Sequence, residues 1–223
     1  MFRPEDYLNL AEFPFPELFA GCEHVWDALK RIGEVAKSHL KPIQLGTVIG
    51  TPYIATDVQI GKGTVIEHGA VIKGPTIVGE NCEIRSSAYI RGNVIVGNGC
   101  VLGNACEFKN AALFNSVQVP HFSYVGDSIL GHKAHLGAGV ILSNVKSAKG
   151  NVFVGKMDTG LRKFGAILGD GADVGCNCVL NPGSLIGRHS VLYPNVLWRG
   201  VCSDNSIVKL RQQQEIVVRS RGN

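Results

Sequence analysis

Residues 60–71 read Ile60-Gly61-Lys62-Gly63-Thr64-Val65-Ile66-Glu67-His68-Gly69-Ala70-Val71, which is one six-residue unit followed by a second. The unit returns as Val78-Gly79-Glu80-Asn81-Cys82-Glu83. Each copy begins with a large aliphatic residue and has a small residue four positions later. A short strand followed by a tight turn has this composition, because glycine and asparagine tolerate the positive φ of corners.

The aliphatic position recurs every six residues over a long stretch of the chain. Steps of six from Ile54 reach Ile60, Ile66, Ile72, Val78, Ile84, Ile90, Val96, Leu102, Phe108 and Phe114. Neither the period of an α-helix nor that of an alternating strand explains a step of six. A coil of stacked parallel strands explains it, with the large residue pointing inward. We therefore predict a mainly β protein whose core is a column of aliphatic side chains.

The repeat continues less regularly after Phe114 and is then interrupted. Val125, Leu130, Leu136 and Leu142 follow it with one five-residue step, and Leu168 resumes it. We predict that a loop at about 144–166 leaves the coil. Such a loop costs packing, so it is the first place to look for a functional site.

Three regions follow from this pattern. Residues 1–43 contain Val25, Leu29, Ile32 and Val35 at helical spacing, and they predict a helical cap over the open edge of the first coil. Residues 44–200 form the coil, and residues 201–223 form an extended tail.

Composition excludes several classes of protein. With 45% hydrophobic and 18% charged residues, the chain of 223 residues is not disordered, and its 28 glycines show no three-residue period of a collagen. The net charge of +4 is dispersed apart from a modest basic C-terminus, so we expect no nucleic-acid partner. The acidic N-terminus and the lack of a long apolar run predict no secretion signal and no membrane partner.

The cysteines indicate the compartment of the protein. Seven cysteines at irregular spacing fit reduced thiols, and we expect a cytoplasmic protein. Cys176 and Cys178 lack a second pair that would make a zinc site, and alternation predicts that both lie on one face of a strand.

Within the coil, residues 91–195 resemble the acetyltransferase domain of the bifunctional bacterial GlmU enzyme, a hexapeptide acyltransferase. The stretches that carry the resemblance are Gly103-Asn104-Ala105-Cys106-Glu107-Phe108-Lys109, Pro120-His121-Phe122-Ser123-Tyr124-Val125-Gly126-Asp127, and Leu136-Gly137-Ala138-Gly139-Val140 followed by Asn144. The resemblance implies a left-handed parallel β-helix and a homotrimer with active sites between subunits. It also implies acetyl transfer from acetyl-CoA, a co-substrate, to the amino group of glucosamine 1-phosphate. That reaction serves nucleotide-sugar and cell-envelope precursor synthesis. No tightly bound cofactor and no metal are implied.

The resemblance assigns three residues to catalysis. His121 matches the general base that takes a proton from the sugar amine, a role that suits an imidazole near neutral pH. Asn144 matches an asparagine at the acceptor and acetyl site. Ala138 matches the position whose backbone N–H stabilises the thioester oxyanion.

It assigns a second set to acceptor binding. Arg91, Lys109 and Lys163 match basic residues that hold the sugar phosphate, since a dianion needs several positive donors. Tyr124 matches a residue that contacts the acceptor.

The chain departs from the family pattern at several of these places. His135 stands where the family has an asparagine that contacts the sugar, and the loop is about a dozen residues longer. The resemblance implies that Ala138, Cys176 and Pro194 bind CoA, and among these positions Cys176 replaces a serine and Pro194 replaces an alanine. The roughly 43 residues before the coil are too few for the nucleotide-transferring domain, so no nucleotidyltransferase activity is predicted.

Two other functions stay open. One is a non-catalytic hexapeptide β-helix used for assembly, which the altered CoA-side positions favour. The other is a zinc enzyme like the gamma-class carbonic anhydrases, built on His132 and His135 together with His121 or His68. The spacing of these histidines does not match that class.

Overall fold

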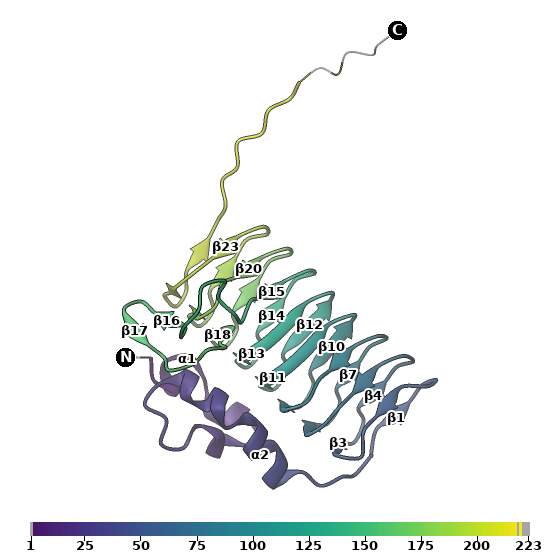
Figure 1. The fold of residues 1–223 in the computed structure, drawn as a ribbon. Coiled ribbons are helices and arrows are strands. Elements are labelled where there is room, and N and C mark those ends of the chain that lie inside the picture. Colours follow the sequence, from purple (N-terminus) through teal and green to yellow (C-terminus); the bar gives the residue numbers. More distant parts are fainter. Residues whose placement is uncertain (1, 218, 220–223) are drawn as a thin grey trace.

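The chain winds into a coil of short parallel strands, as the computed structural model of residues 2–217 and 219 shows (Figure 1). Strands of the coil pair in parallel with the strand one coil later. The predicted mainly β, left-handed parallel β-helix is confirmed.

The strands lie on three faces of the coil. The first face holds β1 (Thr47–Val48), β4 (Val65–Ile66), β7 (Glu83–Ile84), β10 (Val101–Asn104), β12 (Gln118–His121), β14 (His135–Leu136), β19 (Asp173–Val174), β22 (Val191–Leu192) and β25 (Ile207–Val208). The second holds β2 (Tyr53–Ile54), β5 (Val71–Ile72), β8 (Tyr89–Ile90), β11 (Glu107–Leu113), β13 (Tyr124–Leu130), β15 (Ile141–Leu142), β20 (Val179–Leu180) and β23 (Leu197–Trp198). The third holds β3 (Val58–Ile60), β6 (Thr76–Val78), β9 (Val94–Val96), β18 (Ala166–Leu168), β21 (Ser184–Ile186) and β24 (Val201–Cys202), joined by the second halves of β11 and β13.

The inward aliphatic residues form the predicted core column, with one shift. From Ile60 to Phe108 every position at the step of six is fully buried. At the next coil, however, Leu113 rather than Phe114 lies in register with Val96 and Leu130. The prediction for Phe114 is therefore wrong, because this coil closes one residue early.

Phe114 serves a different contact. Its ring stacks on Phe13 of the N-terminal segment, with ring centroids 4.5 Å apart, and it also lies against Phe19. Phe114 is fully buried. Because the coil closes one residue early, this side chain packs against the N-terminal segment instead of the core of the coil.

The third face is apolar on its outer side as well as its inner side. Strands β3, β6, β9, β18 and β21 have three residues each, and β11 and β13 contribute three each to this face. The middle one of the three points outward because side chains alternate along a strand. These middle residues include Ile77, Ile95, Ala112, Ile129, Ile167 and Leu185, and all are buried. An outward apolar column of this kind needs a cover.

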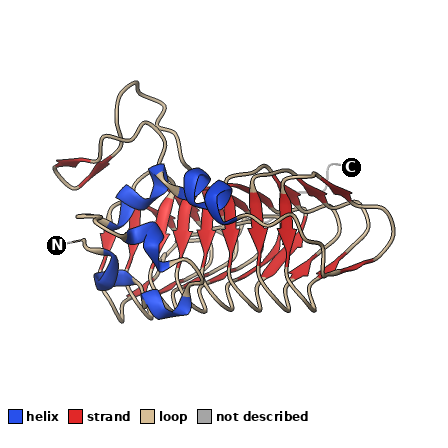
Figure 2. Ribbon diagram, turned by 90° about the horizontal axis from the view of Figure 1, so that it is seen from below, coloured by secondary structure: helices blue, strands red, loops and turns tan. Residues whose placement is uncertain are grey.

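The N-terminal segment supplies the cover (Figure 2). Its helices are α1 (Pro4–Tyr7), η1 (Leu10–Glu12), η2 (Pro16–Phe19), η3 (Val25–Lys30) and α2 (Ile32–His39). Helix α2 packs on β6, β9 and β11, and η3 packs on β13. The prediction that residues 1–43 cap the first coil is therefore wrong. The helices pack on the third face because its outward apolar column is buried there, and Val48 of the first coil stays 49% exposed.

Two further segments complete the chain. The loop between β15 and β18 folds into a hairpin of β16 (Phe153–Val154) and β17 (Met157–Asp158). The prediction that the coil ends at residue 200 is wrong. Strands β24 and β25 continue the parallel pairing as far as Val208, and Cys202 is buried. Residues 209–217 are extended. Among the described residues, no helix has the length and apolar character needed to span a membrane.

The stacking of Phe13 on Phe114 leads to a stability prediction. Phe13→Ala should lower the free energy of unfolding by about 3 kcal/mol, because a buried aromatic ring is lost from the contact between segment and coil. Urea denaturation followed by the fluorescence of buried Trp26 measures this change. Leu45→Ala removes a side chain that is 60% exposed and is the matched control, with an expected change below about 0.5 kcal/mol. Equal effects of the two substitutions would contradict the attachment.

Candidate functional site

Four of the predicted residues stack in one column at the corner between the first and second faces. Successive backbone hydrogen bonds join the column: Gly139 N–H donates to the His121 carbonyl at 3.1 Å, Asn177 N–H to that of Ala138 at 2.8 Å, and Asn195 N–H to that of Cys176 at 2.9 Å. The register of β12, β14, β19 and β22 places the members one above another. In order along the coil they are His121, Ala138, Cys176 and Pro194.

A second group lies on the outer side of the second face. Ile90 pairs with Phe108, so the next residues, Arg91 and Lys109, are neighbours one strand spacing of about 4.8 Å apart. Glu107 pairs with Tyr124 in the next coil and accepts a hydrogen bond from Arg91 at 2.7 Å. Two basic side chains and a tyrosine therefore share one surface.

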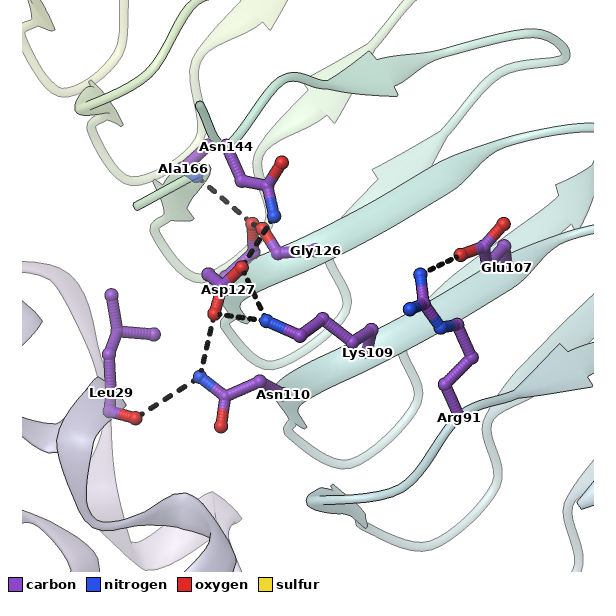
Figure 3. Close-up of polar contacts among 10 residues, drawn as sticks. Leu29, Arg91, Glu107, Lys109, Asn110, Gly126, Asp127, Asn144 and Ala166 are labelled. Atoms are coloured by element: carbon purple, nitrogen blue, oxygen red, sulfur yellow. Dashed lines mark hydrogen bonds and ion pairs between the residues drawn. The ribbon is translucent and has the colours of Figure 1, made fainter. Parts of the chain in front are cut away.

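Asp127 is the centre of this surface. Its buried carboxylate accepts hydrogen bonds from Lys109 Nζ at 2.9 and 3.0 Å and from Asn110 Nδ2 at 3.0 Å. Asn144 Nδ2 donates to the same carboxylate. Figure 3 shows the three donors pointing toward Asp127 from β11 and from the start of the loop. We call Lys109, Asn110, Asp127 and Asn144 the Asp127 cluster.

The backbone at two members of the cluster explains why these residue types occupy it. Asn110 and Asp127 both have φ of 48°, in the left-handed region. Asparagine and aspartate visit this region more readily than other side chains do. There β11 and β13 turn from the second face to the third. The turn thus places an amide and a carboxylate side by side on successive coils.

The cluster is also tied to the N-terminal segment. Asn110 Nδ2 donates a second hydrogen bond, at 3.2 Å, to the carbonyl of Leu29 in η3. The segment that covers the third face therefore helps to hold an Asp127 partner in place.

Tyr124 lies at the edge of the cluster as a neutral phenol. Burial raises the pKa of its hydroxyl, and the Asp127 and Glu107 carboxylates act in the same direction, against a hydrogen bond with Asn144. A Cβ at Gly126 would lie 2.5 Å from the Tyr124 hydroxyl oxygen, so only glycine leaves room for this ring. Tyr124 can therefore donate a hydrogen bond to a ligand.

The two ends of the enlarged loop meet at the cluster. Phe164 N–H donates to the Asn144 carbonyl at 2.9 Å, and Gly165 N–H donates to that of Asp127 at 2.8 Å. Lys163, directly before Phe164, has an exposed side chain. The loop therefore leaves and rejoins the coil beside Asp127.

Not all predicted residues come together. His135 lies on the first face, where its Nδ1 is 2.8 Å from Asp173 Oδ1. His121 is exposed at the end of β12 beside the ring of Phe122, and its imidazole makes no hydrogen bond within the described part of the chain. In one chain, the His121 column and the Asp127 cluster lie at opposite ends of the second face.

The sequence reasoning missed Asp127, Asn110 and Glu107 as members of the site. Asp127 stands in one of the stretches that resemble the family, which was the available signal. Asn110 carried no such signal, since its two contacts join residues far apart in the chain.

The structure also bears on the cysteines and histidines. Cys176 is exposed and Cys178 is buried, so the prediction that they share a face is wrong, because Cys176 lies in a turn rather than in a strand. Within residues 2–217 and 219, no three His, Cys, Asp or Glu side chains converge as metal ligands would.

Substituting the two carboxylates on this face should have unequal effects on stability. Asp127→Asn keeps the left-handed backbone but removes the buried charge that pairs with Lys109, and should cost about 1–3 kcal/mol of unfolding free energy. Glu107→Gln breaks the exposed pair with Arg91 and should cost less than about 1 kcal/mol. Thermal and urea denaturation of both variants measure the difference, and equal losses would argue against Asp127 as the centre of the cluster.

Comparisons with known proteins show which proteins this chain resembles. A family model described as the GMPPB C-terminal domain matches residues 72–181. The bifunctional sugar-1-phosphate nucleotidylyltransferase/acetyltransferase of Sulfurisphaera tokodaii is 36% identical over 84 residues, 36% of this chain and 21% of that protein. The bifunctional protein GlmU of a Picosynechococcus species is 30% identical over 177 residues, 75% of this chain and 36% of that protein.

Solved structures show lower similarity. A putative acetyltransferase from Bacillus cereus has a TM-score of 0.24 and 16% identity, covering 74% of this chain and 78% of its own. This chain spans about a fifth to a third of the length of the two curated relatives named above. The resemblance to the GlmU proteins is thus confirmed: over three quarters of its length the chain is similar to a GlmU protein, which supports a likeness of its coil to the GlmU acetyltransferase domain.

Proposed function

We propose that this protein transfers an acetyl group from acetyl-CoA to the amino group of a sugar phosphate such as glucosamine 1-phosphate, in nucleotide-sugar synthesis. The observation that carries the proposal is the Asp127 cluster beside Arg91 and Tyr124, since it gathers cations, amides and a phenol on one open face. The name of the Sulfurisphaera relative, which includes acetyltransferase and sugar 1-phosphate, supports it.

The transfer needs a general base and a hydrogen-bond donor for the oxyanion, and the column that begins with His121 and Ala138 offers both. The amine nitrogen attacks the thioester carbon, the bond from carbon to sulfur breaks, and the CoA thiolate leaves. His121 takes the proton that the amine loses. The N–H of Ala138 makes no hydrogen bond to any residue that the structure describes, so it is available to the developing oxyanion. Cys176 and Pro194 continue the column in the direction where CoA would extend.

The acceptor phosphate would lie against Arg91, Lys109 and Lys163. A lysine ammonium has three N–H donors, and Lys109 uses two of them on Asp127. One donor is left for a phosphate oxygen. Asp127 thus holds the side chain of Lys109 in place and leaves one of the lysine's N–H donors free.

The complete site would need a second copy of the chain, and we include a homotrimer in the proposal. His121 and the Asp127 cluster lie at opposite ends of one face, so a small acceptor in one chain would reach only one of them. The face between them carries exposed apolar side chains, including Ile141 and Leu197, which a neighbouring copy would cover.

The non-catalytic alternative has one observation in its favour. Arg91 and Lys109 are each paired with a carboxylate, so neither is an unpaired charge awaiting a ligand. A binding or assembly role would need no free imidazole, however, and His121 is exposed and unbonded within the described residues.

Turnover tests the proposal directly. Incubation with acetyl-CoA and glucosamine 1-phosphate should release free thiol, and His121→Ala should lower kcat about 10²–10⁴-fold because the general base is lost. CoA affinity should change little. Absence of thiol release with every amino sugar phosphate tried, together with no thermal shift from acetyl-CoA, would favour the assembly role.

The phosphate contact gives a separate prediction. Lys109→Ala should raise KM for a phosphorylated amino sugar about 10–100-fold, the range expected for a charged hydrogen bond. The unphosphorylated sugar should lose little. Lys62→Ala, which removes an exposed lysine from a distant corner, is the control. Equal losses for both sugars would remove Lys109 from phosphate binding.

A further inference from the structure

The enlarged loop carries the net positive charge of the chain. Residues 143–165 contain five basic side chains, Lys146, Lys149, Lys156, Arg162 and Lys163, and one acidic side chain, Asp158. This excess equals the net charge of +4 of the entire chain, so the remaining residues balance. The expectation of dispersed charge is therefore wrong, because the surplus lies in one loop.

These charges are not neutralised by ion pairs in the structure. Across the described residues, none of the five basic side chains of the loop forms an ion pair, and neither does Arg199. Asp158 instead accepts hydrogen bonds from Gly160 N–H at 2.9 Å and from Asn151 Nδ2 at 3.3 Å. These cations could therefore pair with the negative charges of a bound anion.

Two adjoining cavities lie between this loop and the coil. The larger, of about 430 Å³, is lined by Ser143, Ser147 and Asn181, and the smaller, of about 310 Å³, by Phe153 and two glycines. Lys146, Pro182 and Arg199 line both. No acidic residue lines either, so the joint site offers two cations together with hydroxyl and amide donors.

The smaller cavity adds a flat apolar surface. Phe153 is 49% exposed there, although its neighbours in the chain, Val152 and Val154, are buried. Lys146 Nζ lies 5.5 Å from the centre of its ring. An exposed aromatic ring next to cations suits a nucleobase, whose ring stacks while its phosphates meet the charges.

The cavities continue the surface of the candidate acceptor site. Ser143 immediately precedes Asn144 of the Asp127 cluster, and its N–H donates to the Leu180 carbonyl at 2.9 Å, beside Asn181. Leu180 pairs in turn with Trp198, which precedes Arg199. The same outward register position thus carries Arg91, Lys109, Gly126, Ser143, Asn181 and Arg199 in successive coils.

The loop itself is held in a defined shape. Thr159 Oγ1 donates to the Val152 carbonyl at 2.7 Å, and Lys146 Nζ donates to the Asn151 carbonyl. Val152 and Leu161 are buried. The cavity walls are therefore built before a ligand arrives.

We propose that this site binds a nucleoside diphosphate, with the diphosphate against Lys146 and Arg199 and the base on Phe153. The inference rests on the proposed function and goes beyond it: the cavities beside the candidate acceptor site would hold a nucleoside diphosphate in addition to the sugar phosphate bound at Arg91, Lys109 and Lys163. CoA also contains an adenosine diphosphate, so the test separates the two sources.

Calorimetric titration of the full chain with uridine diphosphate (UDP) at fixed ionic strength tests the assignment. UDP should bind, and Arg199→Gln and Lys146→Gln should each weaken it at least about tenfold, as expected for a lost charged hydrogen bond. Lys37→Gln removes an equal charge from the exposed surface of α2 and should leave the affinity unchanged. A saturating amount of CoA should leave UDP binding intact.

Four outcomes would overturn the proposal. They are no UDP binding, equal affinity in all variants, displacement of UDP by CoA, and tighter binding of a single-stranded oligonucleotide that the same variants abolish. Because binding is measured without turnover, the result is separate from the proposed reaction: UDP binding without acetyl transfer would refute the proposed reaction alone.

Discussion

The parallel register between coils is the constraint on which the rest of the structure depends. Each inward aliphatic side chain lies over its counterpart one coil away, about 4.8 Å distant, and every other position stacks in the same way. Residues 17 or 18 apart in the chain, such as Arg91 and Lys109 or His121 and Ala138, therefore become neighbours. A slip of one residue would turn each column to the opposite side.

The outward apolar column of the third face is a consequence of the same register. Ile95 and Ile129 are fully buried although they point away from the core, because the N-terminal segment covers them. That segment reaches the candidate site through the hydrogen bond between Asn110 and the Leu29 carbonyl. Cover, coil and site are thus parts of one packed unit, and the site is positioned from both sides.

Particular residues show how far the pattern along the chain predicted the fold and the site. Ile60 and its successors were predicted as core because the step of six is local. Phe114 was misplaced because a coil that closes one residue early leaves no mark in an apolar stretch. Lys109 and Asn144 were predicted through a family resemblance, whereas their common partner Asp127 was not, since the contact requires left-handed backbone at two corners.

The sequence by itself determined the coil, its core and the loop that leaves it, because each depends on residues close together in the chain. Only the tertiary structure decided where the N-terminal helices lie, how His121 and Asp127 are divided between the ends of one face, and which cations surround the cavities beneath the loop. Those features depend on surfaces far apart in the chain that meet only after the coils have stacked. Periodicity carries no record of such contacts.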